Sequence, residues 1–481
     1  MEKIANYING EFVEPTSRAY LDNVDPATGG IYSLVPDSDE QDVERATQAA
    51  QAAFPAWSQW SADQRCRMLL KIADRIEADL EPLARAECVD NGKPLSLARS
   101  IDIPRAATNF RFFATAILHA RSECHPMDRV ALNYTLRRPR GVAGIISPWN
   151  LPLYLFSWKV APALATGNTV VAKPSEITPM TAFLLCKICE ACGLPPGVLN
   201  VVHGLGPQVG AAIVAHPRIP TVSFTGGTET GREIARVAAP MFKKIGLELG
   251  GKNPNIILAD ADLDAAIKGT LRSSFLNQGQ ICLAGSRIFV QWPVYEPFVA
   301  RLAERALKLQ VGDPLEAETD QGAVVSKAHL QKICRYLELA KAEGGEIHCG
   351  GGPATDVGGR CKNGFFVQPT VITGIEPECK VNQEEIFGPV VTVTPFADED
   401  EVVAAANATS YGLSASIWTQ DLTRAHRLAE RIECGTVWVN CWLLRDLRVP
   451  FGGTKGSGVG REGGEEAMRF YTEPKNVCIK T

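Results

Sequence analysis

The chain alternates between short apolar runs and longer segments whose apolar positions recur at helical spacing. Between Val142 and about residue 250, the runs GVAGIIS, NTVVAK and TVSFTGG each end in a turn and precede such a helical segment. Apolar strands that alternate with helices are typical of parallel strands joined by crossover helices. The pattern therefore predicts an α/β protein with an open, doubly wound parallel sheet.

The same reading extends to both sides of this region. Residues 1–35 predict short strands and turns, with a hairpin at Asn9 and Gly10, and residues 39–90 predict helices, one of them over 61–85. A second block of strand–helix alternation runs from Asn255 to about Asn440. Further helices are expected over 102–118, 159–166, 178–192, 207–215, 228–239, 263–279, 294–309 and 327–343.

Composition narrows the class of protein. The 481 residues suffice for two to four domains, and 45% hydrophobic with 21% charged residues is typical of packed globular proteins. Lys and Arg number 49 against 54 Asp and Glu, a net charge of −5 that offers no general attraction to nucleic acid or an anionic membrane. The uncharged runs 141–158 and 191–217 contain prolines that a membrane helix does not favour, and the first ten residues lack the apolar core of a secretion signal. We expect a cytoplasmic protein without membrane or nucleic-acid partners.

Fourteen cysteines raise the questions of disulfides and metals. A long chain with a large core does not need a disulfide framework, so reduced thiols are expected. Cys186, Cys189 and Cys192 have a spacing that could suit a metal. On the helix expected here, this spacing also puts them on one face beside Leu185 and Ile188. Core packing is the favoured interpretation, and no metal site is expected.

Three turns that follow predicted strands carry candidate chemistry: SPWN at 147–150, KPSE at 173–176 and FTGGTETG at 224–231. Ligands of parallel sheets gather at the carboxyl ends of strands, and glycines before a helix let a phosphate approach the backbone. Lys173 and Glu176 could bond the hydroxyls of a ribose, and Glu176 would repel a 2′-phosphate, favouring NAD over NADP. Tight turns and a solvated charged turn are the alternatives.

Two further residues are candidates for covalent and acid–base catalysis. Cys282 follows a Gly-Gln turn at the end of an expected helix, where a thiol can face a cleft. Glu248 lies between Leu247 and Leu249, and apolar surroundings would raise its pKa toward that of a neutral-pH base. The alternative for Glu248 is an ion pair with a nearby lysine: Lys243, Lys244 or Lys252.

Taken together, the motifs resemble the aldehyde dehydrogenase superfamily over essentially the whole chain. WN at 149–150, KPSE, FTGGTETG, LELGGKNP, FLNQGQICLAGSR, EEIFGPV at 384–390 and PFGGTKGSGVGREG occur in that family's order. The resemblance implies an NAD-binding domain, a catalytic domain, and a small β bridging element that makes homodimers or homotetramers. The NAD-binding domain is expected at 1–120 with 142–250, the catalytic domain at 251–440, and the bridging element at 121–141 with 464–481. Residues 441–463 are expected to form a substrate-lining loop and the return to the NAD-binding domain.

The resemblance also implies roles for the catalytic candidates. Cys282 would add to the aldehyde, and Asn150 with the backbone N–H of Cys282 would bind the oxyanion. After hydride transfer to NAD, Glu248 would activate water to hydrolyse the thioester. Relatives that transfer the acyl group to coenzyme A generally lack this glutamate, so its presence favours hydrolysis. A catalytically inactive member with a structural role is the alternative, which an NADH absorbance assay decides.

By the same resemblance, NAD would be held by residues from several motifs. Lys173 and Glu176 would hold the adenine ribose, and Glu385 the nicotinamide ribose. Many relatives carry Ser where this chain has Gly227, so one hydroxyl contact to the phosphate is lost. The full set of expected cofactor-binding residues is Trp149, Lys173, Ser175, Glu176, Gly226, Gly227, Thr228, Glu385 and Phe387.

The expected substrate tunnel combines apolar side chains with two arginines. Leu151 and Trp158 fit the apolar lining of the family, whereas Arg105 and Arg445 stand where relatives commonly have apolar residues. A guanidinium group suits a carboxylate, so the arginines suggest a clamp for a carboxylated substrate. The alternative is that they are salt-bridged to Asp102 or Asp446.

The pairing of DIPR with NCWLLRDLRVPFGG resembles the branch of the family that oxidises muconic semialdehydes. The resemblance implies 2-aminomuconic 6-semialdehyde, from the breakdown of tryptophan through kynurenine or of 2-aminophenol, as the substrate. The 2-hydroxy analogue from catechol cleavage is the first alternative, and a retinal-type or other apolar aldehyde the second. Amino and hydroxy substrates cannot be separated by sequence, because both are planar, conjugated and carboxylated.

Overall fold

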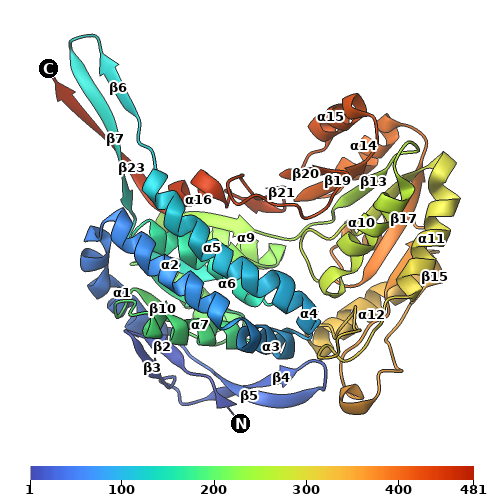
Figure 1. The fold of residues 1–481 in the computed structure, drawn as a ribbon, viewed down its shortest axis with the longest axis horizontal. Coiled ribbons are helices and arrows are strands. Elements are labelled where there is room, and N and C mark those ends of the chain that lie inside the picture. Colours follow the sequence, from blue (N-terminus) through green and yellow to red (C-terminus); the bar gives the residue numbers. More distant parts are fainter. Residues whose placement is uncertain (1) are drawn as a thin grey trace.

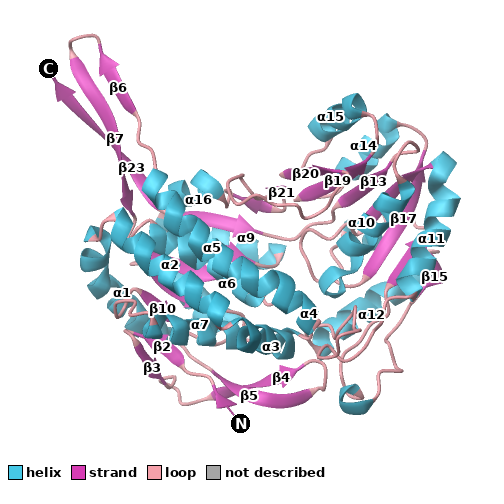
Figure 2. Ribbon diagram, in the orientation of Figure 1, coloured by secondary structure: helices cyan, strands magenta, loops and turns pink. Residues whose placement is uncertain are grey.

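The computed structural model describes residues 2–481, which form two large sheets covered by helices and a smaller sheet that projects from one end (Figure 1; Figure 2). Five parallel strands form the centre of the first large sheet, and short antiparallel strands lie at its edges. In spatial order its strands are β22 (Gly458–Val459), β12 (Lys244–Glu248), β11 (Thr221–Thr225), β8 (Val142–Ile146), β9 (Thr169–Lys173), β10 (Leu199–Val201), β2 (Asn6–Ile8) and β3 (Glu11–Val13).

Helices cover both faces of this sheet, which explains why its central strands are apolar throughout. In β8, Ile145 packs on the face formed by α2, α5, α6 and α7, and its neighbour Ile146 packs on the face formed by α1, α8 and α9. The predicted doubly wound parallel sheet is confirmed. The helices of this unit are α1 (Glu40–Gln59), α2 (Ala62–Ala78), α3 (Leu80–Asn91), α4 (Leu95–Leu97), α5 (Ile103–Ala116), α6 (Pro152–Ala165), α7 (Met180–Ala191), α8 (Ala211–Ala215), α9 (Thr228–Ala238) and α16 (Gly464–Phe470).

The second large sheet is also parallel except at one edge, where β15 runs antiparallel to β16. Its strands in spatial order are β15 (Glu346–Cys349), β16 (Thr370–Thr373), β17 (Val390–Phe396), β14 (Arg287–Gln291), β13 (Pro254–Ile257), β19 (Ser414–Trp418) and β20 (Thr436–Val439). Its helices are α10 (Leu263–Phe275), α11 (Tyr295–Leu307), α12 (Lys327–Ala342), α13 (Lys380–Gln383), α14 (Glu399–Asn407) and α15 (Leu422–Arg431).

Three smaller sheets complete the architecture. The projecting sheet pairs the C-terminal strand with a hairpin, and Figure 1 shows that hairpin standing away from the helices. Two others lie at the N-terminus and beside the second large sheet. The projecting sheet consists of β23 (Thr472–Lys480), β7 (Ala131–Pro139) and β6 (Cys124–Met127). The N-terminal sheet consists of β1 (Glu2–Lys3), β5 (Gly30–Pro36) and β4 (Tyr20–Asp25), and the third sheet of β18 (Tyr411–Gly412) with β21 (Thr454–Lys455).

Several local predictions can be checked directly. The hairpin between β2 and β3 is confirmed, and Asn9 and Gly10 at its turn both have positive φ. The single helix predicted over 61–85 is wrong: α2 ends at Ala78 and α3 begins at Leu80. Pro82 has no N–H to donate to Ala78, so one straight helix cannot continue.

The helix predicted over 263–279 is too long. Helix α10 ends at Phe275, and Asn277 and Gln278 then adopt left-handed backbone conformations with φ of 53° and 55°. The helix predicted over 207–215 is a π-helical turn over Gly206–Gly210 followed by α8. Both departures lie where polar side chains or glycines permit a local change of backbone path.

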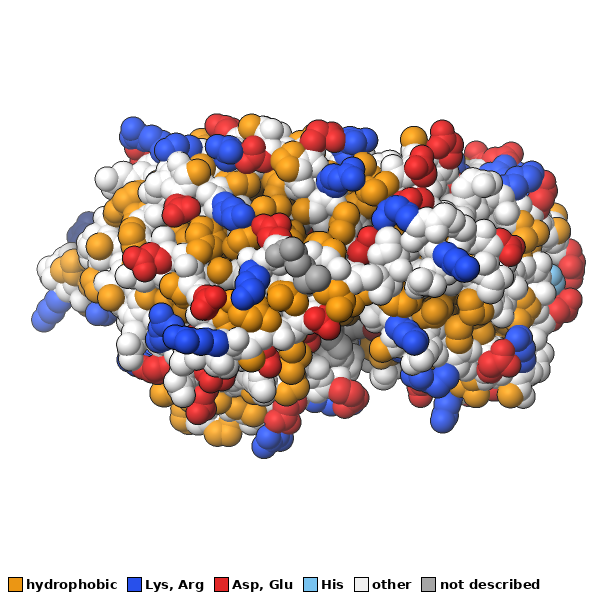
Figure 3. Space-filling view, turned by 90° about the horizontal axis from the view of Figure 1, so that it is seen from below, with side chains coloured by type: hydrophobic (Ala, Val, Ile, Leu, Met, Phe, Trp, Pro, Cys, Tyr) orange, Lys and Arg blue, Asp and Glu red, His pale blue; other side chains and the backbone are white. Residues whose placement is uncertain are grey.

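The surface and the cysteines agree with the composition. Acidic and basic side chains are interspersed on the face in Figure 3, in keeping with the small net charge. No helix within residues 2–481 is both long and apolar enough to cross a bilayer. Cys186, Cys189 and Cys192 lie buried in the core on α7 and just after it, which confirms the core-packing interpretation.

Candidate active site

The loop that carries Cys282 leaves α10 through two strained residues. Left-handed backbone in a residue with a Cβ costs about 1–2 kcal/mol, so Asn277 and Gln278 must be held there by other contacts. The Gln278 side chain does so in part, because its amide donates to the carbonyl of Ala323 at 2.7 Å. The turn directs the chain away from the helix axis and brings Cys282 to the wall of two cavities.

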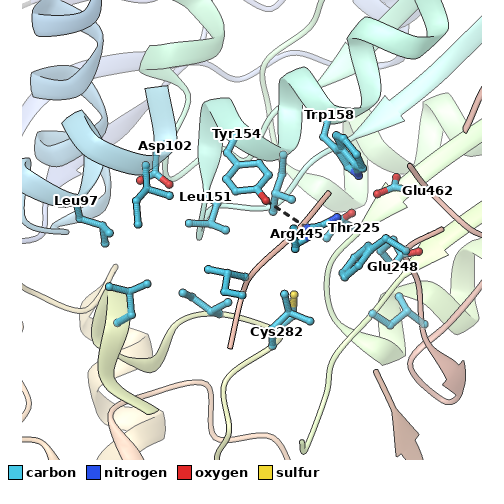
Figure 4. A pocket seen from close by; sticks show the side chains of 18 residues that line it. Leu97, Asp102, Leu151, Tyr154, Trp158, Thr225, Glu248, Cys282, Arg445 and Glu462 are labelled. Atoms are coloured by element: carbon cyan, nitrogen blue, oxygen red, sulfur yellow. Dashed lines mark hydrogen bonds between the residues drawn. The ribbon is translucent and has the colours of Figure 1, made fainter. Parts of the chain in front are cut away.

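Cys282 lies where the two cavities meet. The first contains the predicted tunnel residues Leu151 and Trp158 as well as Glu248 and Arg445, and Figure 4 shows these side chains around Cys282. The second lies on the other side of the thiol, and its lining includes Trp149, Asn150, Gly226, Gly227, Glu385 and Phe387. A nucleophile shared by two cavities can reach a substrate in one and leave the other for a cofactor.

Asn150 lines the second cavity together with Cys282. It follows β8 immediately before α6, so its amide is near the positive end of a helix dipole. Its Nδ2 donates one hydrogen to the carbonyl of Gln280 at 2.9 Å, on the loop that carries Cys282. The second hydrogen of the amide is free of protein acceptors. An amide anchored in this way can act as a donor to an oxyanion.

Glu248 ends β12 and is buried between leucines, as the sequence predicted. Burial, and then the carboxylate of Glu462, raise the pKa of Glu248 well above its ordinary value, against the opposing charges of Lys159 and Arg445. Glu462 itself is held by the Lys159 ammonium at 2.5 Å. The site thus holds a carboxyl group that is more basic than an ordinary glutamate.

The alternative of an ion pair between Glu248 and a neighbouring lysine is wrong. The Lys243 ammonium donates to the carbonyl of His216 at 2.6 Å, and that of Lys244 donates to the carbonyl of Arg469 at 2.9 Å. Among the residues that the structure describes, Glu248 forms no salt bridge with Lys252, and its Oε2 atom has no hydrogen-bond partner.

The thiol of Cys282 lies near the carboxyl groups of Glu385 and Glu248. Burial, together with the charges of Glu385 and Glu248, raises its pKa to about 12. A thiol with so high a pKa needs a base to attack a carbonyl. Glu248 lines the same cavity and is available for that purpose.

The second cavity has features of a dinucleotide site. Gly226 and Gly227 form the turn between β11 and α9, and Thr228 opens the helix. The buried hydroxyl of Thr225, on the wall of this cavity, has no protein partner. A glycine turn at a helix start and an unpartnered hydroxyl fit the phosphate and amide groups of NAD.

Glu385 approaches the same cavity from the other large unit. Its Oε1 accepts from the backbone N–H of Gly251 at 2.9 Å. A Cβ at Gly250 would lie 2.4 Å from its Oε2, so a larger residue there would displace this carboxylate. Burial raises the pKa of Glu385. The carboxylate keeps one oxygen for a ribose hydroxyl.

Aromatic residues close this cavity. The rings of Trp149 and Phe387 meet edge to face at a centroid distance of 5.3 Å. Phe387 has a left-handed backbone with φ of 63°, and His329 Nε2 donates to its carbonyl at 2.7 Å. His329 and Lys332 on α12 line the cavity but were missed by sequence reasoning, because KAHLQK carries no recognisable motif.

The structure places the KPSE residues elsewhere. Lys173 ends β9, beside β8, so its loop leaves the same edge of the sheet as SPWN. Its ammonium bonds Glu176 at 2.8 Å, and Ser175 accepts from the N–H of Ile177 at 3.4 Å. None of these residues lines the cavity that contains Cys282. They lie away from Cys282, as residues that bind the adenosine end of NAD would.

Arg105 and Arg445 come together around Tyr154. Arg445 Nη1 donates to the Tyr154 hydroxyl at 3.2 Å, drawn in Figure 4, and its guanidinium lies 3.9 Å from the ring centroid of Phe451. The guanidinium of Arg105 lies 5.3 Å from the ring of Tyr154 and 5.9 Å from that of Trp158. Arg445 borders both the inner cavity and an outer, open one that Arg105 also lines.

The salt-bridge alternative for these arginines is wrong. Asp102 bonds the Lys93 ammonium at 2.6 Å, and Asp446 bonds Arg448 at 2.6 Å. The Nε and Nη2 atoms of Arg105 are buried without a partner, and this desolvation lowers the pKa of Arg105. An unpaired buried guanidinium is costly, and a bound anion would offset that cost.

Comparisons with known proteins agree with this geometry. Residues 12–477 match the model of the aldehyde dehydrogenase family. A 2-aminomuconic semialdehyde dehydrogenase of Danio rerio is 52% identical, covering 99% of this chain and 98% of the relative. A 2-hydroxymuconic semialdehyde dehydrogenase of Pseudomonas sp. strain CF600 is 46% identical over 100% of both chains. The NAD+ complex of an aldehyde dehydrogenase from Bacillus cereus is 42% identical with a TM-score of 0.97, covering 100% of this chain and 97% of that one.

Proposed function

Because the chain belongs to the aldehyde dehydrogenase family, we propose that it oxidises 2-aminomuconic 6-semialdehyde, a conjugated aldehyde with a carboxylate at its far end. The enzyme is an NAD-dependent aldehyde dehydrogenase. The observation that carries the choice of substrate is the pair Arg105 and Arg445, which have no acidic partner and stand at the entrance to the cavity of Cys282.

A carboxylate would satisfy both guanidinium groups at once. Each charge-assisted hydrogen bond contributes about 1.5–3 kcal/mol, or roughly 10–150-fold in affinity. The aromatic rings of Tyr154, Trp158 and Phe451 lie within 3.9–5.4 Å of the guanidinium groups and hold them in place. These rings also suit a flat, conjugated substrate.

The test compares two substrates in arginine variants. Arg105→Leu and Arg445→Leu should each lower kcat/KM for the carboxylated semialdehyde by about 10–150-fold, and together by less than the product if they share one carboxylate. For an uncharged aldehyde of the same length, the losses should be small. Arg448→Leu is the matched control, because Arg448 lines the same outer cavity but is already paired with Asp446. Equal losses for both substrates would exclude the clamp.

The 2-hydroxy substrate is the second candidate, favoured by the relative from Pseudomonas sp.. Both compounds would present the same carboxylate to the arginines. Side-by-side kcat/KM values for the two semialdehydes decide between them, and a higher value for the hydroxy compound would replace the amino assignment.

The first chemical stage uses Cys282, Glu248 and Asn150. The thiol transfers its proton to Glu248 while sulfur adds to the aldehyde carbon, giving a thiohemiacetal. Its oxyanion accepts hydrogen bonds from Asn150 Nδ2 and from the backbone N–H of Cys282. When the oxyanion re-forms the carbonyl, hydride leaves the carbon and a thioester remains on sulfur; NAD, when bound, supplies the hydride acceptor.

The second stage is hydrolysis. Glu248 first releases to solvent the proton that it took from the thiol, and its carboxylate then removes a proton from water, whose oxygen adds to the thioester. The carbon–sulfur bond then breaks, the carboxylate product leaves, and the thiolate recovers a proton. The Glu462–Lys159 pair beside Glu248 adds a negative and a positive charge that act in opposite directions on the pKa of this base.

We propose that NAD lies along the second cavity toward the KPSE turn. Trp149, Glu385 and Phe387 would surround the nicotinamide end, and the Gly226–Thr228 turn the pyrophosphate. The adenosine end would meet Lys173, Ser175 and Glu176. Support comes from the unpartnered Thr225 hydroxyl and from the shared sheet edge of these loops.

We further propose that the projecting sheet of β6, β7 and β23 joins subunits into a homodimer or homotetramer. Leu132 and Ile479 are cross-strand neighbours there, with 36% and 50% of their surface exposed. Such an apolar pair on a projecting sheet favours burial against a second copy. We also propose that the first large sheet belongs to the NAD-binding domain and the second to the catalytic domain, with Cys282 where the two domains approach each other.

All cysteines within residues 2–481 are free thiols, which supports a cytoplasmic location.

A further inference from the structure

Three charged side chains are buried beneath the SPWN loop. Lys93, in the turn between α3 and α4, places its ammonium 2.6 Å from Asp102 Oδ2 and 3.6 Å from Glu87 Oε1, and all three side chains are fully buried. Removing such charges from water costs more free energy than an apolar replacement would. Stability alone therefore does not explain this cluster.

The ammonium of Lys93 also reaches Asn150. It donates to the main-chain carbonyl of Asn150 at 3.2 Å, which also accepts from Asn277 Nδ2 at 3.0 Å. Asn277 in turn donates to the carbonyl of Gln280 at 3.2 Å, the acceptor that Asn150 Nδ2 uses at 2.9 Å. Lys93 is the only cationic donor within residues 2–481 that bonds this ring of amides and carbonyls.

The backbone before α5 explains how Asp102 reaches Lys93. The segment Ala98–Asp102 is π-helical, and Pro104 follows it without an N–H for the carbonyl of Ser100. The wider turn places the carboxylate of Asp102 inward, where it also borders the substrate cavity, as Figure 4 shows. A continuous line of contacts therefore joins the cavity wall to Lys93 and Asn150.

We propose that Lys93 is the positioning residue for the oxyanion donor Asn150. This inference rests on the proposed role of Asn150. A peptide unit is planar, so a bond to the carbonyl of Asn150 fixes the plane that follows its Cα and limits how its side chain can turn. Asn277 lies on the loop that carries Cys282, and Asn91, at the end of α3, donates to the same carbonyl at the longer distance of 3.4 Å. Lys93 bonds that carbonyl at 3.2 Å with a charged donor, which Glu87 and Asp102 tie to α3 and the π-helical segment.

A double-mutant cycle on the whole enzyme tests this. The readout is the rate constant of the first NADH burst, which reports acylation rather than hydrolysis. Asn150→Ala should slow the burst by about 100–1000-fold. Lys93→Met, which keeps the shape of the side chain, should slow it by roughly 10–100-fold. In the Asn150→Ala background, Lys93→Met should cost less than about twofold, because its partner is gone.

Controls separate this proposal from a loss of fold and from failure of the proposed function. Lys71→Met removes another lysine that donates to a carbonyl, that of Cys192 at 2.7 Å, and should leave the burst unchanged. Melting temperature and NAD affinity identify misfolded variants. If Lys93→Met does not fold, Asp102→Asn, which keeps the shape of its side chain, should show a smaller loss and the same dependence on Asn150.

The outcomes are distinct. Independent, multiplying effects of the Lys93 and Asn150 substitutions would overturn the positioning role while leaving Asn150 as the oxyanion donor. An unchanged burst in Asn150→Ala would instead overturn the proposed role of Asn150 itself.

Discussion

Gly227 is a residue at which a substitution should strengthen NAD binding. Its φ is −72°, which any residue adopts, and a Cβ there would meet no atom within 4 Å. Gly227→Ser should therefore tighten NAD binding by about 10-fold through one hydroxyl bond to a charged phosphate, with a small gain in stability from better helix capping. Isothermal titration with NAD measures the change.

The control is Gly250→Ser. A Cβ at Gly250 would lie 2.4 Å from Glu385 Oε2, so this serine should weaken NAD binding. Equal effects of the two serines would show that the open space at Gly227 does not face the phosphate.

The buried carboxyl of Glu248 makes stability depend on pH. Burial and Glu462 raise its pKa well above the ordinary value in the folded protein, whereas the unfolded chain keeps the ordinary value. Its contribution to stability is thus fully present below the ordinary pKa and is lost as pH rises through the raised one. The melting temperature of Glu248→Gln should exceed that of the native enzyme by a margin that grows as pH rises from the ordinary glutamate pKa toward the raised one. A margin independent of pH would contradict the raised pKa.

Loops between elements decide cofactor choice. Glu176, in the loop after β9, is 33% exposed in its side chain and bonded to Lys173. Glu176→Gln should narrow the preference for NAD over NADP at least about fivefold, since repulsion between like charges at a surface is worth about 1 kcal/mol or more. Ratios of kcat/KM for the two cofactors measure this, with Glu229→Gln, an exposed residue on α9, as the control. An unchanged ratio would show that the 2′-phosphate of NADP does not lie near Glu176.

Strands and most helices were predictable, because buried parallel strands and amphipathic helices leave clear periodicities. Cys282, Glu248 and Asn150 could be singled out because they lie in a series of motifs that resembles the aldehyde dehydrogenase family; their places at strand and helix ends alone left other roles open. The turn at Asn277 and Gln278 could not be predicted, because the left-handed backbone of these two residues is stabilised by contacts with segments distant in sequence. Lys93 was equally hidden, since its partners are brought together only by tertiary packing.

Assembly of the whole molecule is tested at the projecting sheet. Leu132→Arg with Ile479→Arg places two cations on a face that would be buried between copies, so the assembly should dissociate. Light scattering measures the mass. Leu307→Arg is the control, because Leu307 is 66% exposed at the end of α11 and lies outside this sheet. An unchanged mass in the double variant would place the interface elsewhere.

The whole reaction passes through one covalent intermediate, which mass spectrometry can observe. Glu248→Ala should slow acylation but slow hydrolysis much more, so long incubation with NAD and 2-aminomuconic 6-semialdehyde should give one equivalent of NADH per active site. Intact and peptide masses should then show the acyl group of the semialdehyde on Cys282 and on no other cysteine. Absence of the adduct, or its attachment to another residue, would contradict the proposed chemistry.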